Sequence, residues 1–323
     1  MDKKIVLAGI IGAAVGDAAG VPVEFKSREM LAKDPVQGMR GFGTHNVPPG
    51  YWSDDTSMML AGLDSLTNGY SPEDIMEKFR RWMKDGEYTP DGRVFDYGLI
   101  CHRAISRYIK GAKATNCGGY DYYDNGNGSL MWILSACLYM AAKERSGELT
   151  TKEAVRKIHE CSGLTHAHVI SKAACGLYYF CVKEILADKE NSLITVLQNG
   201  INKGMAYYRE NEWYNFEDAC AQYVSLEDIY RFAELDENEI TSGGYVVDTM
   251  EAAFWCLLNT EDYRSCILKA VNLGSDTDTV AAVAGGLAGL FYGYESIPQE
   301  WKDVLARRAW IEELCEKAAE KFQ

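Results

Sequence analysis

Two short acidic segments carry the residue types best suited to chemistry. Residues 53–56 read Ser-Asp-Asp-Thr, and residues 276–279, about 220 positions further along, read Asp-Thr-Asp-Thr. Each segment directly precedes a strongly apolar stretch with helical spacing. Ser, Thr and Asp at a helix start can cap free backbone N–H groups, but a single such residue is enough for that role.

Four aspartates brought together repel one another unless protons or cations neutralise them. Carboxylate and hydroxyl oxygens, without His or Cys, are the ligands that Mg²⁺ and Mn²⁺ prefer. Two neighbouring aspartates on each of two segments offer enough oxygens for a pair of ions. From the residues alone, helix capping and a dinuclear cation site both remain open.

The elements that must position these segments are predicted to be helices. Apolar residues recur three and four positions apart, and alternating β-branched runs are scarce. We therefore expect an all-α protein with one domain over residues 1–323, because no long Pro/Ser linker divides the chain. The main loops are expected at 38–50, 118–128 and 207–217. Helices are expected at 54–66, 72–84, 94–110, 129–143, 151–161, 166–187, 246–258, 279–291 and 299–321.

Two sets of glycines have the spacing of one helix face. Gly12 and Gly16 are four residues apart, as are Gly285, Gly289 and Gly293. Glycine leaves no side chain to hold two helices apart, so this spacing predicts close helix packing.

The composition excludes several classes of partner. The 33 Lys and Arg residues against 47 Asp and Glu give a net charge of −14, which lacks the basic excess that attracts nucleic acid or an anionic membrane. No run of 18 apolar residues occurs, so we expect no membrane span. Lys3, Lys4 and the apolar residues after them imitate a secretory signal, but Asp17 interrupts the pattern.

The ten cysteines contain no CxxC pair, and His166 and His168 lack further ligands at zinc-finger spacing. Several cysteines lie inside helical patterns, which favours buried thiols in a reducing compartment over disulfides. We therefore expect a cytoplasmic protein without a structural zinc.

Six motifs, in the same order along the chain, resemble the ADP-ribosylglycohydrolase family, which includes the dinitrogen-reductase-activating glycohydrolase. They lie at 16–24, 52–58, 126–131, 165–168, 244–249 and 274–279, and the resemblance extends from about Gly9 to residues 308–311. It implies a compact all-helical fold with two Mg²⁺ or Mn²⁺ ions. It also implies hydrolysis of the glycosidic bond between ADP-ribose and an acceptor, either a protein side chain or a small molecule, with ADP-ribose as product.

The resemblance also implies roles for individual residues. Glu24 and Asp96 are the acids that would take a proton from water, and Glu24 has metal binding as a second possible role. A helix-start role for Asp96 is the alternative, because Leu99 stands where some relatives have Asn. The metal ligands would be Ser53, Asp54, Asp55, Asp276, Asp278 and Thr279.

The remaining motifs correspond to substrate contacts. Gly126, Gly128 and Ser129 are expected to begin an apolar helix, whose free N–H groups would receive a diphosphate. His166 and Tyr245 would border the adenine or the ribose, and Met131 belongs to the same motif as the glycines.

Two departures from the family's motifs leave the identity of the acceptor open. Trp132 stands where relatives often have Arg, and Val169 replaces a frequent Pro. Arginine, serine, acetyl ester and guanidine linkages all fit the resemblance.

Three alternative functions remain: a non-catalytic ADP-ribose reader, a structural protein on the same fold and a di-metal phosphoesterase. An intact set of six metal positions favours an enzyme.

Overall fold

The structure is a computed structural model that describes residues 1–211 and 216–322. Within these ranges the regular secondary structure is helical, with two isolated β-bridges and no strand, so the all-α prediction is confirmed. The α-helices are α1 (Lys3–Gly20), α2 (Arg28–Lys33), α3 (Asp54–Leu66), α4 (Pro72–Asp85), α5 (Leu99–Ile109), α6 (Leu134–Arg145), α7 (Thr151–Gly163), α8 (Val169–Ala187), α9 (Leu193–Glu210), α10 (Phe216–Cys220), α11 (Ile229–Ala233), α12 (Val246–Leu258), α13 (Tyr263–Asn272), α14 (Thr277–Tyr292), α15 (Gln299–Val304) and α16 (Arg308–Lys321). Short 3₁₀ helices are η1 (Val21–Val23), η2 (Ala114–Asn116), η3 (Tyr122–Asp124), η4 (Ala221–Asp228), η5 (Glu237–Glu239) and η6 (Tyr294–Ser296).

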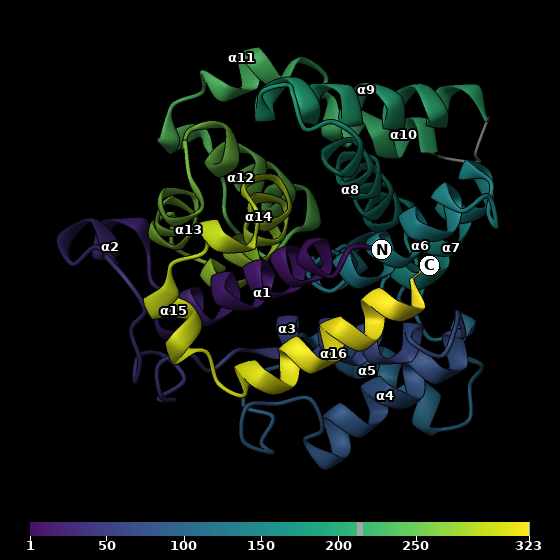
Figure 1. Ribbon diagram of the computed structural model, residues 1–323, viewed down its shortest axis with the longest axis horizontal. Helices are drawn as coiled ribbons and strands as arrows, with labels where there is room; N and C mark the ends of the chain where they lie inside the picture. Colours follow the sequence, from purple (N-terminus) through teal and green to yellow (C-terminus); the bar gives the residue numbers. More distant parts are fainter. Residues whose placement is uncertain (212–215, 323) are drawn as a thin grey trace.

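Helix α1 runs through the middle of the molecule and packs along α14 (Figure 1). A Cβ atom added at Gly12 would lie 2.5 Å from the carbonyl oxygen of Gly285, and one at Gly16 would lie 2.1 Å from that of Ala281. Only glycine permits this approach, so the predicted close helix packing is confirmed. Gly293 serves a different purpose, because it ends α14 with φ of +88°.

The segment that contains α1, Lys3–Val23, is long and apolar enough to cross a membrane by length and composition alone. Of its most apolar window, 94% is buried inside the molecule. Core helices of soluble proteins pass the same test, so this feature is weak evidence for a span.

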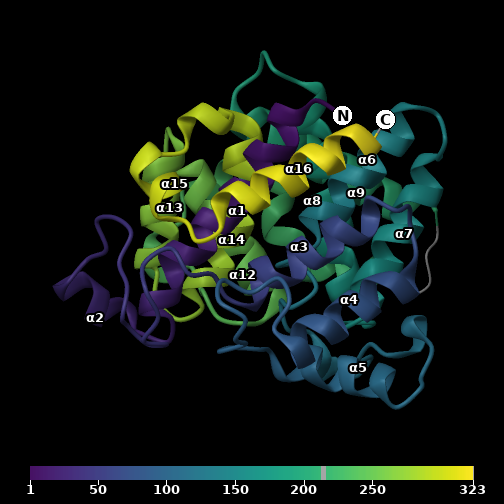
Figure 2. The same ribbon diagram turned by 60° about the horizontal axis from the view of Figure 1, so that its bottom comes forward.

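The other helices surround this central pair. Helices α3, α4 and α5 cover one side of it, whereas α9, α10 and α11 lie at the opposite side (Figure 1). Figure 2 shows α16 crossing close to α1, with both ends of the chain near each other. The amino group of Met1 donates to the carbonyl oxygen of Ala319 at 3.2 Å.

The predicted boundaries of α3 and α12 agree with the structure. Helices α9 and α13 were not expected. The expected helix at 299–321 is divided into α15 and α16, with Arg307 between them at φ of +46°. The loop expected at 207–217 lies partly in α9 and α10, and its residues 212–215 fall outside the described ranges.

Three helices begin later than expected, because tertiary hydrogen bonds hold the preceding residues. Helix α5 begins at Leu99 and α6 at Leu134, each five residues late. Before α6, the Asn127 side chain donates to Asp276 and Thr249. Before α8, the N–H of Ala167 donates to the carbonyl oxygen of Gly119, so this helix begins only after its cap, His168.

Candidate active site

One cavity of about 450 Å³ gathers most of the predicted site residues from distant parts of the chain. Both predicted acids and five of the six predicted metal ligands line it. So do four of the six predicted substrate contacts. The lining includes Glu24, Asp54, Asp55, Asp96, Gly126, Gly128, Met131, His166, Asp276, Asp278 and Thr279.

The first acidic segment is fixed at the start of α3 by a carboxylate from α1. The buried side chain of Asp17 accepts hydrogen bonds from the backbone N–H groups of Ser53 and Thr56, at 3.0 Å each. The hydroxyl of Ser53 accepts from the N–H of Asp55 at 3.2 Å. Because Asp17 and Ser53 perform the capping, Asp54 and Asp55 are left to line the cavity.

The second acidic segment is fixed at the start of α14. The hydroxyl of Thr277 donates to the carbonyl oxygen of Gly20 at 2.8 Å, which ties this end of α14 to the end of α1. A Cβ atom at Gly20 would lie 2.4 Å from the backbone of Asp278, so the two ends are in direct contact. The Asn127 amide donates to Asp276 at 2.7 Å.

Glu24 joins this second segment through a backbone pairing next to it. The N–H of Phe25 donates to the carbonyl oxygen of Ser275 at 2.7 Å. Carboxylate oxygens of Glu24, Asp276 and Asp278 all lie within 4.8 Å of one another. We call Glu24, Asp54, Asp55, Asp276 and Asp278 together the carboxylate wall.

The carboxylate wall concentrates acidic groups in a place that is largely buried from water. Burial raises the pKa of Glu24 to about 7, although its bond with His45 opposes the shift. Burial, followed by repulsion from nearby carboxylates, raises the pKa of Asp54, Asp55 and Asp278 well above their usual range. Burial also raises the pKa of Asp17 to about 6. A counter-charge in the cavity would relieve this repulsion.

The donor atoms of the wall fit hard divalent cations. The Oδ2 atom of Asp55 is buried and finds no hydrogen-bond partner within the described residues. Carboxylate oxygens, with the Thr279 hydroxyl beside them, are ligands typical of Mg²⁺ and Mn²⁺. An unpaired, buried carboxylate oxygen is costly unless a ligand satisfies it.

The second predicted acid, Asp96, lies before α5 and does not cap that helix, whose first turn follows Gly98. The Asp96 carboxylate lies within 4.8 Å of both Glu24 and the His45 ring. The alternative of a helix-start role for Asp96 is therefore wrong. The N–H of Gly98 instead donates to Asp54 at 3.1 Å, which places the Asp96 loop against the wall.

The glycine segment passes close to His166. A Cβ atom at Gly128 would lie 2.9 Å from the His166 ring, and one at Gly126 would lie 3.3 Å from it. Burial lowers the pKa of His166 to about 4, so its ring is neutral at pH 7. The expectation that Ser129 begins a helix is wrong, because α6 begins at Leu134.

Three predicted residues do not line the cavity. The Ser53 hydroxyl acts as the cap of α3. The Ser129 hydroxyl is fully buried and accepts from Ser162 at 3.0 Å. The backbone of Tyr245 pairs with Gly126 in an isolated bridge, while its phenol group donates to Gln222 at 3.5 Å.

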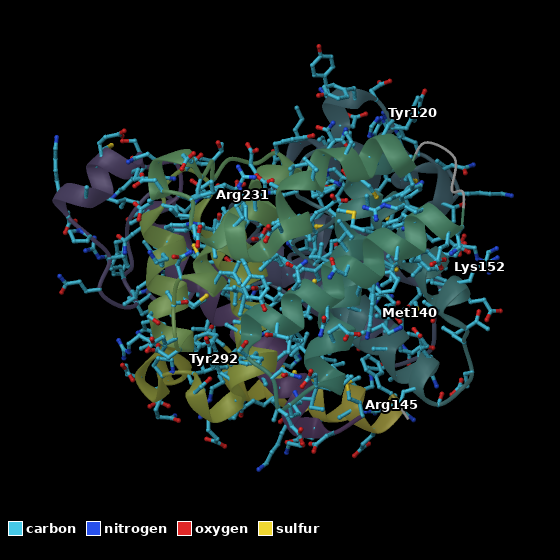
Figure 3. The ribbon with its side chains drawn as sticks, turned by 90° about the horizontal axis from the view of Figure 1, so that it is seen from above. Tyr120, Met140, Arg145, Lys152, Arg231 and Tyr292 are labelled. Carbon is cyan, nitrogen blue, oxygen red and sulfur yellow. The ribbon has the colours of Figure 1, made fainter. Side chains whose placement is uncertain are left out.

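Several cavity residues were not foreseen from the sequence. Arg103 of α5 is the one Lys or Arg side chain among the described residues that line the cavity. Phe25, Tyr97 and Tyr123 are 69%, 51% and 92% exposed, and they also line it. Exposed lining residues lie at the mouth of a cavity, so we call these three the aromatic rim. Tyr120, labelled near the edge of the molecule in Figure 3, is 75% exposed.

Asp17, His45 and Asn127 support the site and were also not assigned to it. The signal for Asp17 is a carboxylate inside an otherwise apolar helical stretch. The signal for Asn127 is its place between the two glycines of one motif. No pattern in the sequence marks His45.

Comparison with known proteins agrees with the fold. A solved structure described as an ADP-ribosylglycohydrolase-related protein complex superposes with a TM-score of 0.78. Its sequence is 27% identical, and the match covers 99% of both chains. The family model for ADP-ribosylglycohydrolase matches residues 2–323, so this chain belongs to the ADP-ribosylglycohydrolase family. The resemblance found in the motifs is thereby confirmed.

Two relatives illustrate the range of the family. The chain is 32% identical to ADP-ribosylarginine hydrolase Tri1 of Serratia proteamaculans, over 95% of this chain and 77% of the relative. It is 30% identical to ADP-ribosyl-[dinitrogen reductase] glycohydrolase of Rhodospirillum rubrum, over 91% and 88% of the two chains.

Proposed function

We propose that this protein is a metal-dependent hydrolase that cleaves the bond between ADP-ribose and an arginine-type acceptor and releases ADP-ribose. The observation that carries the proposal is the carboxylate wall, which contains an unpaired, buried Asp55 oxygen on one side of a cavity of ligand size. The names of the two relatives support an acceptor on arginine or on a protein.

Two Mg²⁺ or Mn²⁺ ions are the counter-charges that this donor set suits. Asp54, Asp55, Asp276, Asp278 and Thr279 would hold them, with Ser53 contributing if its hydroxyl turns from its capping bond. When bound, such ions lower the pKa of water and orient hydroxyl groups of a sugar.

The protein's own groups supply the remaining requirements of glycoside cleavage. The bond breaks through a transition state with positive charge at the anomeric carbon, which the negative charge of the wall stabilises. Glu24 or Asp96 takes the proton from the attacking water, since both carboxylates line the cavity. Neutral His166 and the backbone of Gly126 and Gly128 border the bound ligand.

The diphosphate needs positive groups in an otherwise acidic cavity. The expected helix start at Ser129 is absent, so it cannot supply them. Residues 97–101 and Arg103 line the cavity instead, and they include the start of α5, which no side chain caps. Free N–H groups at a helix start and a guanidinium group both bind phosphate oxygens.

The proposal places the enzyme in the cytoplasm, without a nucleic-acid or membrane partner. The ten cysteines are all free, and nine of them are buried. The net charge of −14 disfavours polyanionic partners.

The direct test is to incubate the protein with ADP-ribosyl-arginine and to identify the product by chromatography. With Mg²⁺ we expect free ADP-ribose, and after EDTA treatment we expect almost none. Equal rates with and without metal would contradict the proposal. AMP as the product would identify a phosphoesterase, and binding of ADP-ribose without turnover would identify a reader.

A further inference from the structure

The loop between α2 and α3 is packed tightly against the segment that carries Glu24. A Cβ atom at Gly43 would lie 1.6 Å from the carbonyl oxygen of Pro22, so only glycine fits there. The N–H of Thr44 donates to the same oxygen at 2.9 Å, and its hydroxyl donates to the carbonyl oxygen of Glu24 at 2.7 Å. The next residue, His45, is therefore held at a fixed place beside the Glu24 side chain.

The His45 ring contacts the Glu24 carboxylate directly. Its Nε2 atom is hydrogen-bonded to Oε2 of Glu24, and the two side chains are only 11% and 6% exposed. The ring also lies beside two phenylalanines, with centroids 6.1 Å from Phe25 and 5.2 Å from Phe95. These rings restrict the orientation of the imidazole, so the hydrogen bond has a defined direction.

Glu24 needs this bond because its other polar neighbours repel it. Asp96, Asp276 and Asp278 each have a carboxylate oxygen within 4.8 Å of the Glu24 carboxylate. Among the described residues, His45 is the one hydrogen-bond partner that the structure shows for that carboxylate. Without it, like-charge repulsion would favour a rotamer that turns the carboxylate away from the wall.

We propose that His45 is a positioning residue, which holds Glu24 in the carboxylate wall between Asp96 and the start of α14. The expected effect of His45 on turnover rests on the proposed function. The contact between His45 and Glu24 does not depend on that function. His45 touches neither the acceptor nor the reacting atoms and acts through Glu24. Neighbours that orient a functional ligand usually contribute 10- to 100-fold in activity.

The variant His45→Phe keeps an aromatic ring beside the two phenylalanines and removes the hydrogen bond. We expect kcat for ADP-ribosyl-arginine to fall about 10- to 100-fold, while the Kd for ADP-ribose changes less than about threefold. His45→Gln retains a donor near the Nε2 position and should recover most of kcat. The control is His102→Phe, whose ring stacks on Tyr97 beside the cavity, and it should keep the wild-type kcat.

A double-mutant cycle separates this role from a general structural one. In a Glu24→Gln background, His45→Phe should cause no further loss of kcat, because the group that it positions has already been changed. Wild-type kcat in His45→Phe would overturn the proposal, as would multiplicative losses in the double variant.

A measurement without turnover distinguishes failure of this inference from failure of the proposed function. In metal-free protein labelled with ¹⁵N at histidine, Glu24→Gln should shift the ring nitrogen resonances of His45 and leave those of His102 unchanged. Unshifted His45 resonances would overturn the inference even in an active enzyme. A shift in a protein that never releases ADP-ribose would support the contact and contradict the proposed function.

Discussion

The carboxylate wall and the aromatic rim surround the same cavity but are built from different kinds of structure. Four of the five wall carboxylates are at most 6% exposed, and three of them start or directly follow the start of α3 or α14. The rim residues are at least 51% exposed and lie outside the α-helices. Core packing therefore fixes the wall, whereas little besides local contacts fixes the rim.

This contrast separates two tasks. Buried groups that cannot move without disturbing α1 and α14 are suited to chemistry that depends on accurate placement. Exposed rings on connections can change without cost to the core, so they are suited to selecting the acceptor. Changes in the wall should alter kcat, and changes in the rim should alter KM.

The largest effect is expected in the wall. Asp278→Asn removes one buried carboxylate and should lower kcat at least about 1,000-fold, which corresponds to roughly 4 kcal/mol of transition-state stabilisation. The control is Asp248→Asn in α12, a half-buried carboxylate that does not line the cavity. Steady-state kinetics with unchanged circular dichroism checks the result, and retained turnover in Asp278→Asn would remove its assigned role.

Arg103 is expected to have the next largest effect. Arg103→Gln should raise the Kd for ADP-ribose about tenfold, since a charge-assisted bond to a diphosphate is lost. Binding of adenosine, which lacks phosphates, should not change. Calorimetry measures both ligands, and Lys110→Gln at the other end of the same helix is the control. An equal loss for adenosine would show that Arg103 does not recognise the diphosphate.

The pH dependence of stability tests the electrostatics of the wall in metal-free protein. Glu24 has a pKa of about 7, and those of Asp54, Asp55 and Asp278 are also raised, so the folded state binds more protons than the unfolded state near neutral pH. Stability should therefore rise as the pH falls from 8 to 6.5.

The expected rise in Tm over this interval is about 1–2 °C in EDTA, equivalent to about 1 kcal/mol for a chain of this length. The buried His159 and His166 have pKa values lowered to about 3 and about 4, so they oppose the trend increasingly as the pH approaches their ordinary value of 6.5. Saturating Mg²⁺ should abolish the rise by keeping the carboxylates ionised. Scanning calorimetry at pH 8 and 6.5 measures this change in Tm. A Tm in EDTA that is lower at pH 6.5 than at pH 8 would contradict the account.

The smallest effect is expected at the rim. Tyr123→Ala should raise KM about two- to fivefold, as expected for the loss of one exposed aromatic contact, and should leave kcat within a factor of two. Tyr120→Ala, an exposed ring that does not line the cavity, is the control. A fall in kcat as large as that of Asp278→Asn would break the division between wall and rim.

Sequence reasoning located the wall because its residues lie in motifs, and three of them lie within the first two residues of α3 or α14. The motifs around Asp55 and Asp278 predicted both acidic segments, and the glycine spacing predicted close helix packing without identifying α1 and α14 as partners. The late start of α6 was missed, because it depends on hydrogen bonds from Asn127 to residues more than 100 positions away. Local propensity carries no information about such partners.

The remaining misses have the same origin. Tyr245 was expected at the ligand, but its side chain direction follows from the backbone pairing with Gly126. Arg103 and His45 are single residues without a recurring pattern, and only the folded chain shows what they face. Exposed residues such as Tyr123 are similarly invisible, since no periodicity marks the mouth of a cavity.

The central claim is that two remote segments form one dinuclear cation site. Equilibrium dialysis of metal-free protein against Mn²⁺, followed by electron paramagnetic resonance, tests this claim most directly. The account predicts two bound Mn²⁺ ions per chain with a spin-coupled spectrum, and loss of that coupling in both Asp55→Asn and Asp278→Asn. No Mn²⁺ bound above background, or equal binding in wild type and both variants, would contradict it.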